Sequence, residues 1–245
     1  RVMSDVSYPF KVDGNFGGVI TNFASQRFIL FSEHQLIKVP TSMPDEIAAA
    51  FSLSAQTAYS MVRKANLKEN DNVLITALTS NTSLAIVERL KFCDVNINVF
   101  GMSSKAPSLK EHIKGWGLKN IFLPPFSQKV HLKDSICSDE KFDVVFDPFI
   151  DLYFASLLNH INFNSRYLFC GFYHQHSSFK EVEIVPQNFL LSVYGTCVTY
   201  NMSLIGNCLG CRDDLENALS DYLNGKFNIN IDSVYTGEQL VDFFR

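Results

Sequence analysis

Short apolar runs alternate with amphipathic stretches along the middle of the chain. Residues 71–105 open with Val73-Leu74-Ile75, bend through hydroxyl-bearing residues, continue with apolar residues at helical spacing, and end in a second apolar run over 95–100. A strand, a tight turn, a helix and a second strand form the βαβ unit that opens a doubly wound nucleotide-binding sheet. The pattern therefore predicts an α/β fold, with a Rossmann-like parallel sheet covered by helices on both faces.

The flanking segments continue this alternation. Runs rich in β-branched and aromatic residues predict strands, and amphipathic stretches with cap signals predict helices. The predicted strands cover residues 1–3, 16–23, 27–31, 36–40, 120–123, 142–147, 166–171 and 193–205. The predicted helices cover residues 153–161, residues 213–223 with Gly225 after the end, and a segment from a hydroxyl cap at Ser42 toward Lys64 with a break near Ser54.

Composition narrows the class of protein. The 245 residues are 47% hydrophobic and 19% charged, with a net charge of −4, which disfavours a nucleic-acid partner because no basic stripe is present. No apolar run is long enough to span a bilayer, so we expect no membrane segment. Six scattered cysteines, several in apolar runs, predict a reducing, cytoplasmic compartment. The start at Arg1 has no charged and apolar leader, so we expect no signal peptide, and the missing initiator Met suggests a fragment, a processed form or an excised domain.

Several motifs occur in the order of one enzyme family. They are Arg1-Val2-Met3, Phe16-Gly17-Gly18-Val19, Asp45-Glu46-Ile47-Ala48-Ala49, Gln56-Thr57-Ala58-Tyr59, Phe142-Asp143-Val144-Val145-Phe146-Asp147 and the stretch 206–225. In this order they resemble the medium-chain dehydrogenase/reductase superfamily, especially its zinc-independent quinone-oxidoreductase and enoyl-reductase branches. The resemblance covers nearly the whole chain, and the shared order of the motifs makes it specific.

The resemblance implies an arrangement and an activity. Residues 1–45 would be a partial GroES-like β segment, 46–227 a Rossmann-like nucleotide-binding domain, and 228–245 a return toward the first part, so the substrate-binding half would be largely missing. The implied function is NADPH-dependent reduction of a C=C or C=O bond in a small-molecule or acyl substrate, as an enoyl-reductase-like part of a larger polypeptide. Relatives dimerise by continuing the sheet edge to edge, which implies a homodimer through residues 193–205, or membership of a larger assembly.

The expected phosphate-binding turn departs from the family pattern. Where the resembled branch has a glycine-rich turn, this chain has Ala77, Ser80, Asn81 and Ser83 at the glycine positions. Added Cβ atoms crowd a pyrophosphate, whereas the free N–H groups of the helix start still attract anions. The cofactor-binding residues expected in this turn are Thr79, Ser80, Asn81 and Thr82, whose hydroxyl and amide groups add donors. The alternative is that this stretch only caps a helix.

The end of the second strand favours NADPH over NADH. By resemblance, Gly101 stands where NAD-binding members carry an acid for the ribose diol, and Ser104 and Lys105 stand near the 2′-phosphate of NADPH. The alternative for Lys105 is a solvated side chain at a helix start. Thr57 and Gly171 complete the expected cofactor-binding residues. By resemblance Thr57 and Tyr59 would lie near the nicotinamide, and the alternative is that both belong to a packed helix face.

No metal or strong catalytic side chain is assigned. Hydride chemistry belongs mainly to the cofactor, so the catalytic residues stay open. Leu53 stands where zinc-dependent relatives place a cysteine ligand, so we expect no zinc. The Cys208–Cys211 spacing resembles a redox or metal motif, and His174-Gln-His176 resembles part of a metal site, but neither has supporting ligands nearby. Two hypotheses therefore remain, an NADPH-dependent reductase and a non-catalytic scaffold that keeps the Rossmann fold without its cofactor.

Overall fold

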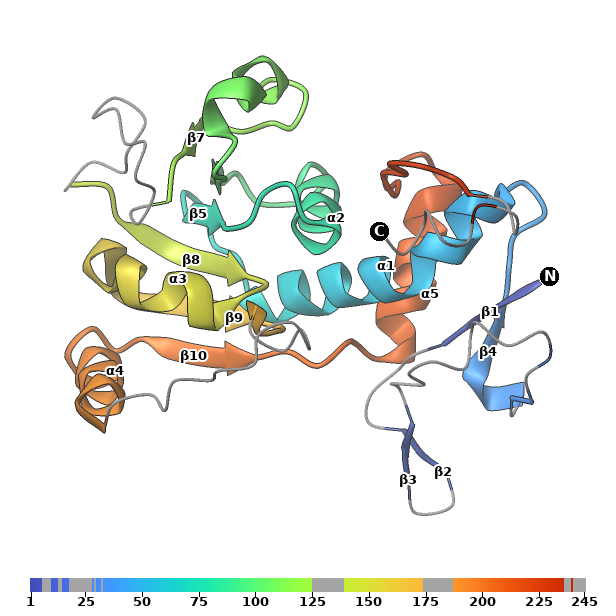
Figure 1. Cartoon of the computed structure of the whole chain (residues 1–245), viewed down its shortest axis with the longest axis horizontal. Helices are drawn as coiled ribbons and strands as arrows, with labels where there is room; N and C mark the ends of the chain where they lie inside the picture. Colours follow the sequence, from blue (N-terminus) through green and yellow to red (C-terminus); the bar gives the residue numbers. More distant parts are fainter. Residues whose placement is uncertain are drawn as a thin grey trace.

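The computed structural model describes residues 1–5, 10–12, 15–17, 28, 30–31, 33–124, 139–173, 187–235 and 239 of the chain. Some predictions fall outside these residues. They are most of the predicted strand at 16–23, part of that at 27–31, and the pair His174 and His176. Figure 1 shows a sheet at one end of the molecule and small β pairs at the other, joined by a long helix.

A six-stranded parallel sheet is the centre of the structure, and it confirms the predicted fold class. Its spatial order is β10-β9-β8-β5-β6-β7, and each neighbouring pair is parallel. This is the order of a dinucleotide-binding sheet, in which the chain leaves the first strand to one side and later returns to the other. The strands are β5 (Asn72–Ile75), β6 (Asn98–Met102), β7 (Asn120–Phe122), β8 (Phe142–Asp147), β9 (Ile161–Phe169) and β10 (Ser203–Gly206).

Helices cover both faces of this sheet because alternate strand residues point to opposite sides. Val73 and Ile75 pack into one apolar core, whereas Leu74 between them packs into the other. The first core is closed by α1 (Asp45–Ala65), α2 (Asn81–Leu90) and α5 (Arg212–Leu223). The second is closed by α3 (Ile150–Leu157), with the 3-10 turn η3 (Leu158–His160) after it, and by α4 (Gln187–Thr199).

Two short antiparallel pairs form the amino-terminal part. Strand β1 (Val2–Ser4) pairs with β4 (Leu36–Lys38), which follows the 3-10 turn η1 (Glu33–Gln35), and β2 (Phe10–Val12) pairs with β3 (Asn15–Gly17). The β1–β4 pair lies beside the start of α1 (Figure 1), where Arg1 forms an ion pair with Asp45. Because α1 then runs onto the sheet, it connects the amino-terminal part to the nucleotide-binding-type domain.

Three local predictions need correction. Helix α1 continues without a break at Ser54, and Pro44 rather than a hydroxyl residue precedes its first turn. Residue 161 is the first residue of β9 and not the end of a helix. The strand expected at 95–100 lies at Asn98–Met102, because the preceding residues form the turn that leads into it. The helix predicted at 213–223 is confirmed as α5 with one residue added.

The largest correction concerns residues 193–205, predicted as one extended run. Residues 187–199 are helix α4, and only Ser203–Gly206 form a strand. The β-branched and aromatic residues there favour a strand locally, but consecutive parallel strands need a crossover connection, which is usually a helix. Val193 is buried in the second core and Cys197 packs against it, so α4 covers the sheet face next to β10. Among the described residues, no helix combines the length and apolar character needed to cross a membrane.

Candidate functional site

The candidate site lies at the carboxyl edge of the sheet, where β5 and β8 are neighbours. From β5 the chain passes through a short turn into α2 and on to β6, on one side of β5. From β8 it passes to β9 on the other side. Ligands of doubly wound sheets bind outside the strand ends at such a switch in direction. The turn that contains the expected phosphate-binding residues lies at this edge of the sheet.

Two hydroxyl groups of the β5–α2 turn, those of Ser80 and Ser83, form hydrogen bonds within the turn itself. The Oγ of Ser80 caps α2 by accepting a hydrogen bond from the backbone N–H of Ser83 at 3.2 Å. The Oγ of Ser83 donates to the carbonyl of Thr76 at 2.7 Å, and Ser83 is buried. Ala77 holds a left-handed conformation, with φ +44°, at a position where the resembled family has glycine. The helix-cap alternative is thus correct for Ser80, whose side chain caps α2.

Other groups of the turn remain open to solvent. Thr79 and Asn81 are exposed, and Thr82 is half-buried. Within the part of the chain that the structure describes, the backbone N–H groups of Asn81 and Thr82 have no acceptor. These two donors lie at the positive end of the α2 dipole, which is the physical basis of anion binding at a helix start.

Leu78 fills the space beside Gly101 at the end of β6. Its side chain is fully buried, and its backbone N–H donates to the carbonyl of Met102 at 2.9 Å. A Cβ built on Gly101 would lie 2.5 Å from Cδ2 of Leu78. The contact with Leu78 is enough to explain why no acidic side chain stands at Gly101. The missing acid is therefore weaker support for NADPH than the sequence pattern alone indicates.

The residues after β6 stay accessible at the same edge. Ser103 is buried, and its Oγ accepts a hydrogen bond from the N–H of Lys105 at 3.1 Å. Ser104 and Lys105 are exposed just before the 3-10 helix η2 (Ala106–His112). Since β6 lies next to β5, the Lys105 ammonium belongs to the same sheet edge as the start of α2.

A buried carboxylate connects three strand ends beneath the site. Asp147 accepts hydrogen bonds from Thr76 Oγ1 at 2.7 Å, from the N–H of Phe149 at 2.9 Å and from the hydroxyl of Tyr167. Burial raises the pKa of Asp147, and these hydrogen bonds only partly offset that effect. With no exposed surface, Asp147 has no route for proton exchange with a substrate. It stabilises the sheet edge, and neither Thr76 nor Tyr167 could be assigned to it from sequence spacing.

A second recess lies at the ends of β9 and β10. It has a volume of about 370 Å³ and is lined in part by Gly171, whose expected role in cofactor binding stays a prediction. A Cβ on Gly171 would lie 2.9 Å from the carbonyl oxygen of Pro148, so backbone packing also explains this glycine. Burial raises the pKa of neighbouring Cys170 to about 12, which keeps that thiol protonated. The recess is lined by Lys64, Phe169, Cys170, Gly171, Phe172, Gly206, Asn207 and Cys208.

Comparison with known proteins identifies the fold. No protein-family model and no curated protein matches the sequence. Among solved structures, a putative alcohol dehydrogenase from Sinorhizobium meliloti 1021 aligns with a TM-score of 0.67 and 18% identity, over 94% of this chain and 61% of that one. Acetophenone reductase from Geotrichum candidum in complex with NAD gives 0.62 and 20%, over 86% and 55%. The human synaptic vesicle membrane protein VAT-1 homolog-like protein gives 0.60 and 21%, over 86% and 60%.

The chain has a medium-chain dehydrogenase/reductase-like fold. It spans about half to three fifths of the length of the first solved structures it matches. At these identities the likeness shows the fold, and the zinc-independent branch stays a prediction. The dehydrogenase-like fold agrees with the strand order and with the position of the candidate site at the sheet edge.

The structure places Tyr59 and Thr57, the two helix residues expected near a nicotinamide, on different sides of α1. Tyr59 points from α1 to α5, where its hydroxyl donates to Asp221 at 2.7 Å, and Arg89 lies 4.9 Å from its ring centroid. Burial is the main cause that raises the pKa of Tyr59. Tyr59 therefore packs between helices, which fits the alternative of a packed helix face. Thr57 is buried two residues earlier on α1, on a different side of the helix, and stays a prediction.

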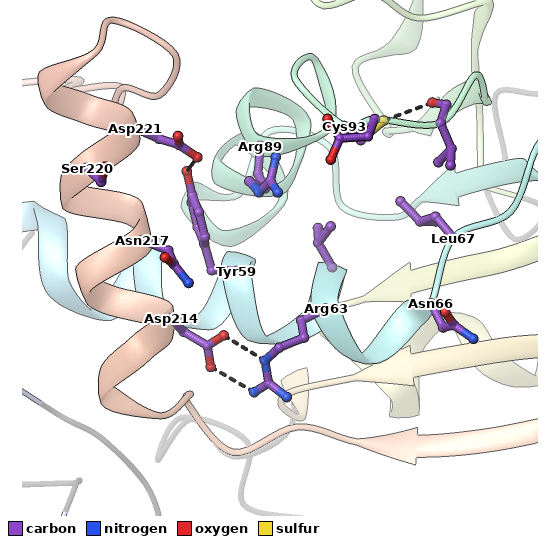
Figure 2. Close-up of a pocket in the computed structure, with 13 residues that line it drawn as sticks. Tyr59, Arg63, Asn66, Leu67, Arg89, Cys93, Asp214, Asn217, Ser220 and Asp221 are labelled. Carbon is purple, nitrogen blue, oxygen red and sulfur yellow. Dashed lines mark hydrogen bonds and ion pairs between the residues drawn. The ribbon is translucent and has the colours of Figure 1, made fainter.

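A cavity of about 490 Å³ lies between α1, α2 and α5 (Figure 2). Its wall includes Leu67, which precedes β5, and Val95, which precedes β6, so it lies toward the amino ends of the strands. Figure 2 shows Arg63 reaching across to Asp214, with N–O distances of 2.8 and 2.9 Å. Because this cavity is at the opposite end of the strands from the α2 start, it is not the nucleotide site.

The described residues contain no cluster of three His, Cys, Asp or Glu side chains that could hold a metal ion. Cys208 and Cys211 lie in the loop before α5, and His174 and His176 lie outside the described residues. The expectation that the chain needs no zinc stays a prediction.

Proposed function

We propose that the chain is the nucleotide-binding part of an NADPH-dependent reductase that acts on a polarised C=C or C=O bond. The observation that carries the proposal is the exposed start of α2 at the switch between β5 and β8. Two backbone N–H groups there have no acceptor among the described residues, and Lys105 follows the neighbouring strand β6. The dehydrogenase-like fold supports a nicotinamide cofactor, since acetophenone reductase, a structural neighbour, was solved with NAD.

The residues present fit a dinucleotide at three places. The N–H groups of Asn81 and Thr82 would donate to pyrophosphate oxygens. Thr79 and Ser104 offer hydroxyl donors at the same edge, and Lys105 would pair with a 2′-phosphate. Gly171, at the end of β9, lines a recess with room for a planar ring. When bound, NADPH would supply the hydride, and this chain would bind and orient it.

Titration calorimetry with NADPH, and with NADH as a control, tests this proposal. We expect NADPH to bind more tightly than NADH. The substitution Lys105→Ala should weaken NADPH binding about 10- to 100-fold, the size of one lost charge-assisted hydrogen bond, and leave NADH unchanged. The exposed Lys91→Ala on the same domain is the matched control. Absence of binding by either dinucleotide at millimolar concentration would end the proposal.

A non-catalytic scaffold is the second candidate, and the Leu78–Gly101 contact favours it. Leu78 occupies space next to the position where an acid would hold a ribose, so the edge is partly closed on that side. If wild-type chain binds neither dinucleotide, and Leu78→Val does not create binding, the scaffold function is supported. Binding by the wild-type chain excludes it.

The substrate and partners are also proposals. Because the chain spans about half to three fifths of its structural neighbours, the small-molecule or acyl substrate would be held largely by groups outside it. We propose that a second copy pairs along β10, which is one of the two edge strands of the sheet as far as the described residues show. An edge strand presents unpaired backbone groups, and Leu204 on it is 39% exposed. The proposed interface is therefore the strand Ser203–Gly206, and no longer the whole stretch 193–205 that the sequence predicted.

A further inference from the structure

The loop between β10 and α5 carries two thiols at Cys-x-x-Cys spacing. Cys208 is exposed and lines the recess at the ends of β9 and β10. Cys211 is half-buried and immediately precedes the first residue of α5. The reductase proposal gives neither thiol a chemical role, although Cys208 lines the recess that it assigns to a planar ring.

Hydrogen bonds from α1 and within the loop connect its residues. Ser60 Oγ donates to Asn207 Oδ1 at 2.8 Å, and Asn207 Nδ2 donates to the carbonyl of Leu209 at 2.7 Å. Gln56 Nε2 donates to the carbonyl of Cys211 at 2.9 Å. Leu209, between the cysteines, has φ +55°, so the backbone bends there. A bend between residues three apart is what a short disulfide loop needs, because bonded cysteines require Cα atoms within about 7 Å.

The two sulfurs have different charged neighbours. Cys211 Sγ donates to Asp214 Oδ2 at 3.2 Å and lies 3.8 Å from Nη2 of Arg63. The ammonium of Lys64 lies in the wall of the same recess as Cys208, and its pKa is lowered, mainly by burial. Cations and the amino end of α5 therefore lie beside this pair of thiols, and the Asp214 carboxylate accepts the hydrogen bond of the Cys211 thiol.

We propose that Cys208 and Cys211 form a redox-active dithiol that exchanges with low-molecular-weight disulfides. Exposed Cys208, as its thiolate, attacks one sulfur of the disulfide and releases the first thiol, which takes the proton that Cys208 lost. Cys211 then loses its proton and attacks Cys208 Sγ. The second thiol leaves with that proton. Two cysteine thiols are oxidised to one protein disulfide, and the small disulfide is reduced to two thiols.

Oxidised and reduced glutathione, mixed to give potentials from about −300 to about −180 mV, test the proposal. The chain is equilibrated at each potential, its free thiols are alkylated, and intact and peptide masses are measured. We expect two of the six thiols to become protected together, as a Cys208–Cys211 disulfide.

Variants separate the two steps. Cys211→Ser should accumulate a glutathione adduct on Cys208, because the resolving thiol is absent. Cys208→Ser should exchange at least 10-fold more slowly. Cys93→Ser, which removes a half-buried thiol hydrogen-bonded to the carbonyl of Val95, is the matched control and should behave as wild type. The proposal is overturned if wild-type chain holds a stable glutathione adduct on Cys208, if both cysteines stay alkylated at every potential, or if either pairs with another cysteine.

Discussion

At the scale of single residues, Leu78 and Gly101 depend on each other. Leu78 is fully buried in the first core, and its Cδ2 lies where a side chain on Gly101 would begin. The sequence shows only that an acid is missing at the end of β6. The structure adds that a neighbouring turn residue has taken part of that space.

We therefore predict that Gly101→Ala destabilises the chain by about 1–3 kcal/mol, the range for overpacking a core. Leu78→Val removes the Cδ atoms, so in that background Gly101→Ala should lower the free energy of unfolding much less. Urea denaturation of the four chains gives the coupling energy as a double-mutant cycle. Gly115→Ala, whose Cβ would meet its nearest atom at 3.7 Å, is the control. Equal costs in both backgrounds would show that the contact is unimportant.

Asp147 makes stability depend on pH in a defined direction. Burial raises its pKa in the folded chain, so the folded state holds this proton to higher pH than the unfolded state. Its stabilising contribution is complete below the unfolded pKa of about 4 and is lost as pH rises through the folded pKa. The unfolding free energy of the wild-type chain, relative to Asp147→Asn, should fall as pH rises from about 4.

This pH dependence can be measured by urea unfolding at several pH values between about 4 and about 8, the range above the unfolded pKa of the carboxyl. Asp94→Asn removes an exposed carboxylate and controls for general charge effects. A wild-type advantage over Asp147→Asn that stays constant or grows with pH would contradict the predicted direction.

At the scale of elements, one arginine joins α1 to the sheet. Arg166 on β9 donates from Nη1 to the carbonyls of Ala65 and Asn66, at 3.0 and 2.6 Å. Its Nη2 pairs with buried Asp71 at 2.8 Å. Orphan carbonyls at the carboxyl end of a helix need partners, and a cation there also interacts favourably with the helix dipole. Arg166 therefore fixes α1, β5 and β9 relative to one another.

We predict that Arg166→Met destabilises the chain by about 3–5 kcal/mol, because it leaves the Asp71 carboxylate buried without its partner. Lys91→Met, which removes a partly exposed ion pair with Glu88, should cost at most about 1 kcal/mol. Guanidinium chloride would screen charges, so unfolding in urea is the suitable measurement. A loss below about 1 kcal/mol for Arg166→Met would show that this anchor contributes little.

At the scale of the whole molecule, several exposed apolar side chains lie around the β10 edge. Leu191, Tyr194 and Val198 are exposed on α4, spaced as one stripe of a helix, and Leu204 is exposed on β10. Within the described part of the chain β10 has no outer neighbour, and the proposed pairing with a second copy would cover this edge and the stripe beside it.

Leu204→Lys should convert a dimer of the chain into a monomer, because the proposed two-fold pairing would bring two ammonium groups together in the interface. Light scattering after size-exclusion chromatography measures the mass. Leu223→Lys, at an exposed leucine on α5, is the control and should leave the mass unchanged. A wild-type chain that is monomeric at about 100 micromolar, near the upper end of ordinary working concentrations, would contradict the pairing.

The sequence alone determined the alternation of strands and helices and hence the parallel sheet, because both periods are local and are visible in the order of apolar residues. It also indicated the position of the turn after β5 and of Lys105 after β6. Helix α4 could not be predicted from the sequence, because its residues favour a strand locally and only the crossover to β10 requires a helix.

Only the tertiary structure decided how distant residues share space at the sheet edge. Leu78 lies against Gly101, Tyr167 donates to Asp147, and Tyr59 turns toward Asp221 and away from the expected site. Each of these contacts joins segments 20 to 162 residues apart, and the longest is the 162-residue separation of Tyr59 and Asp221. Periodicity carries no information about such pairs, because they form only when the strands have been placed side by side.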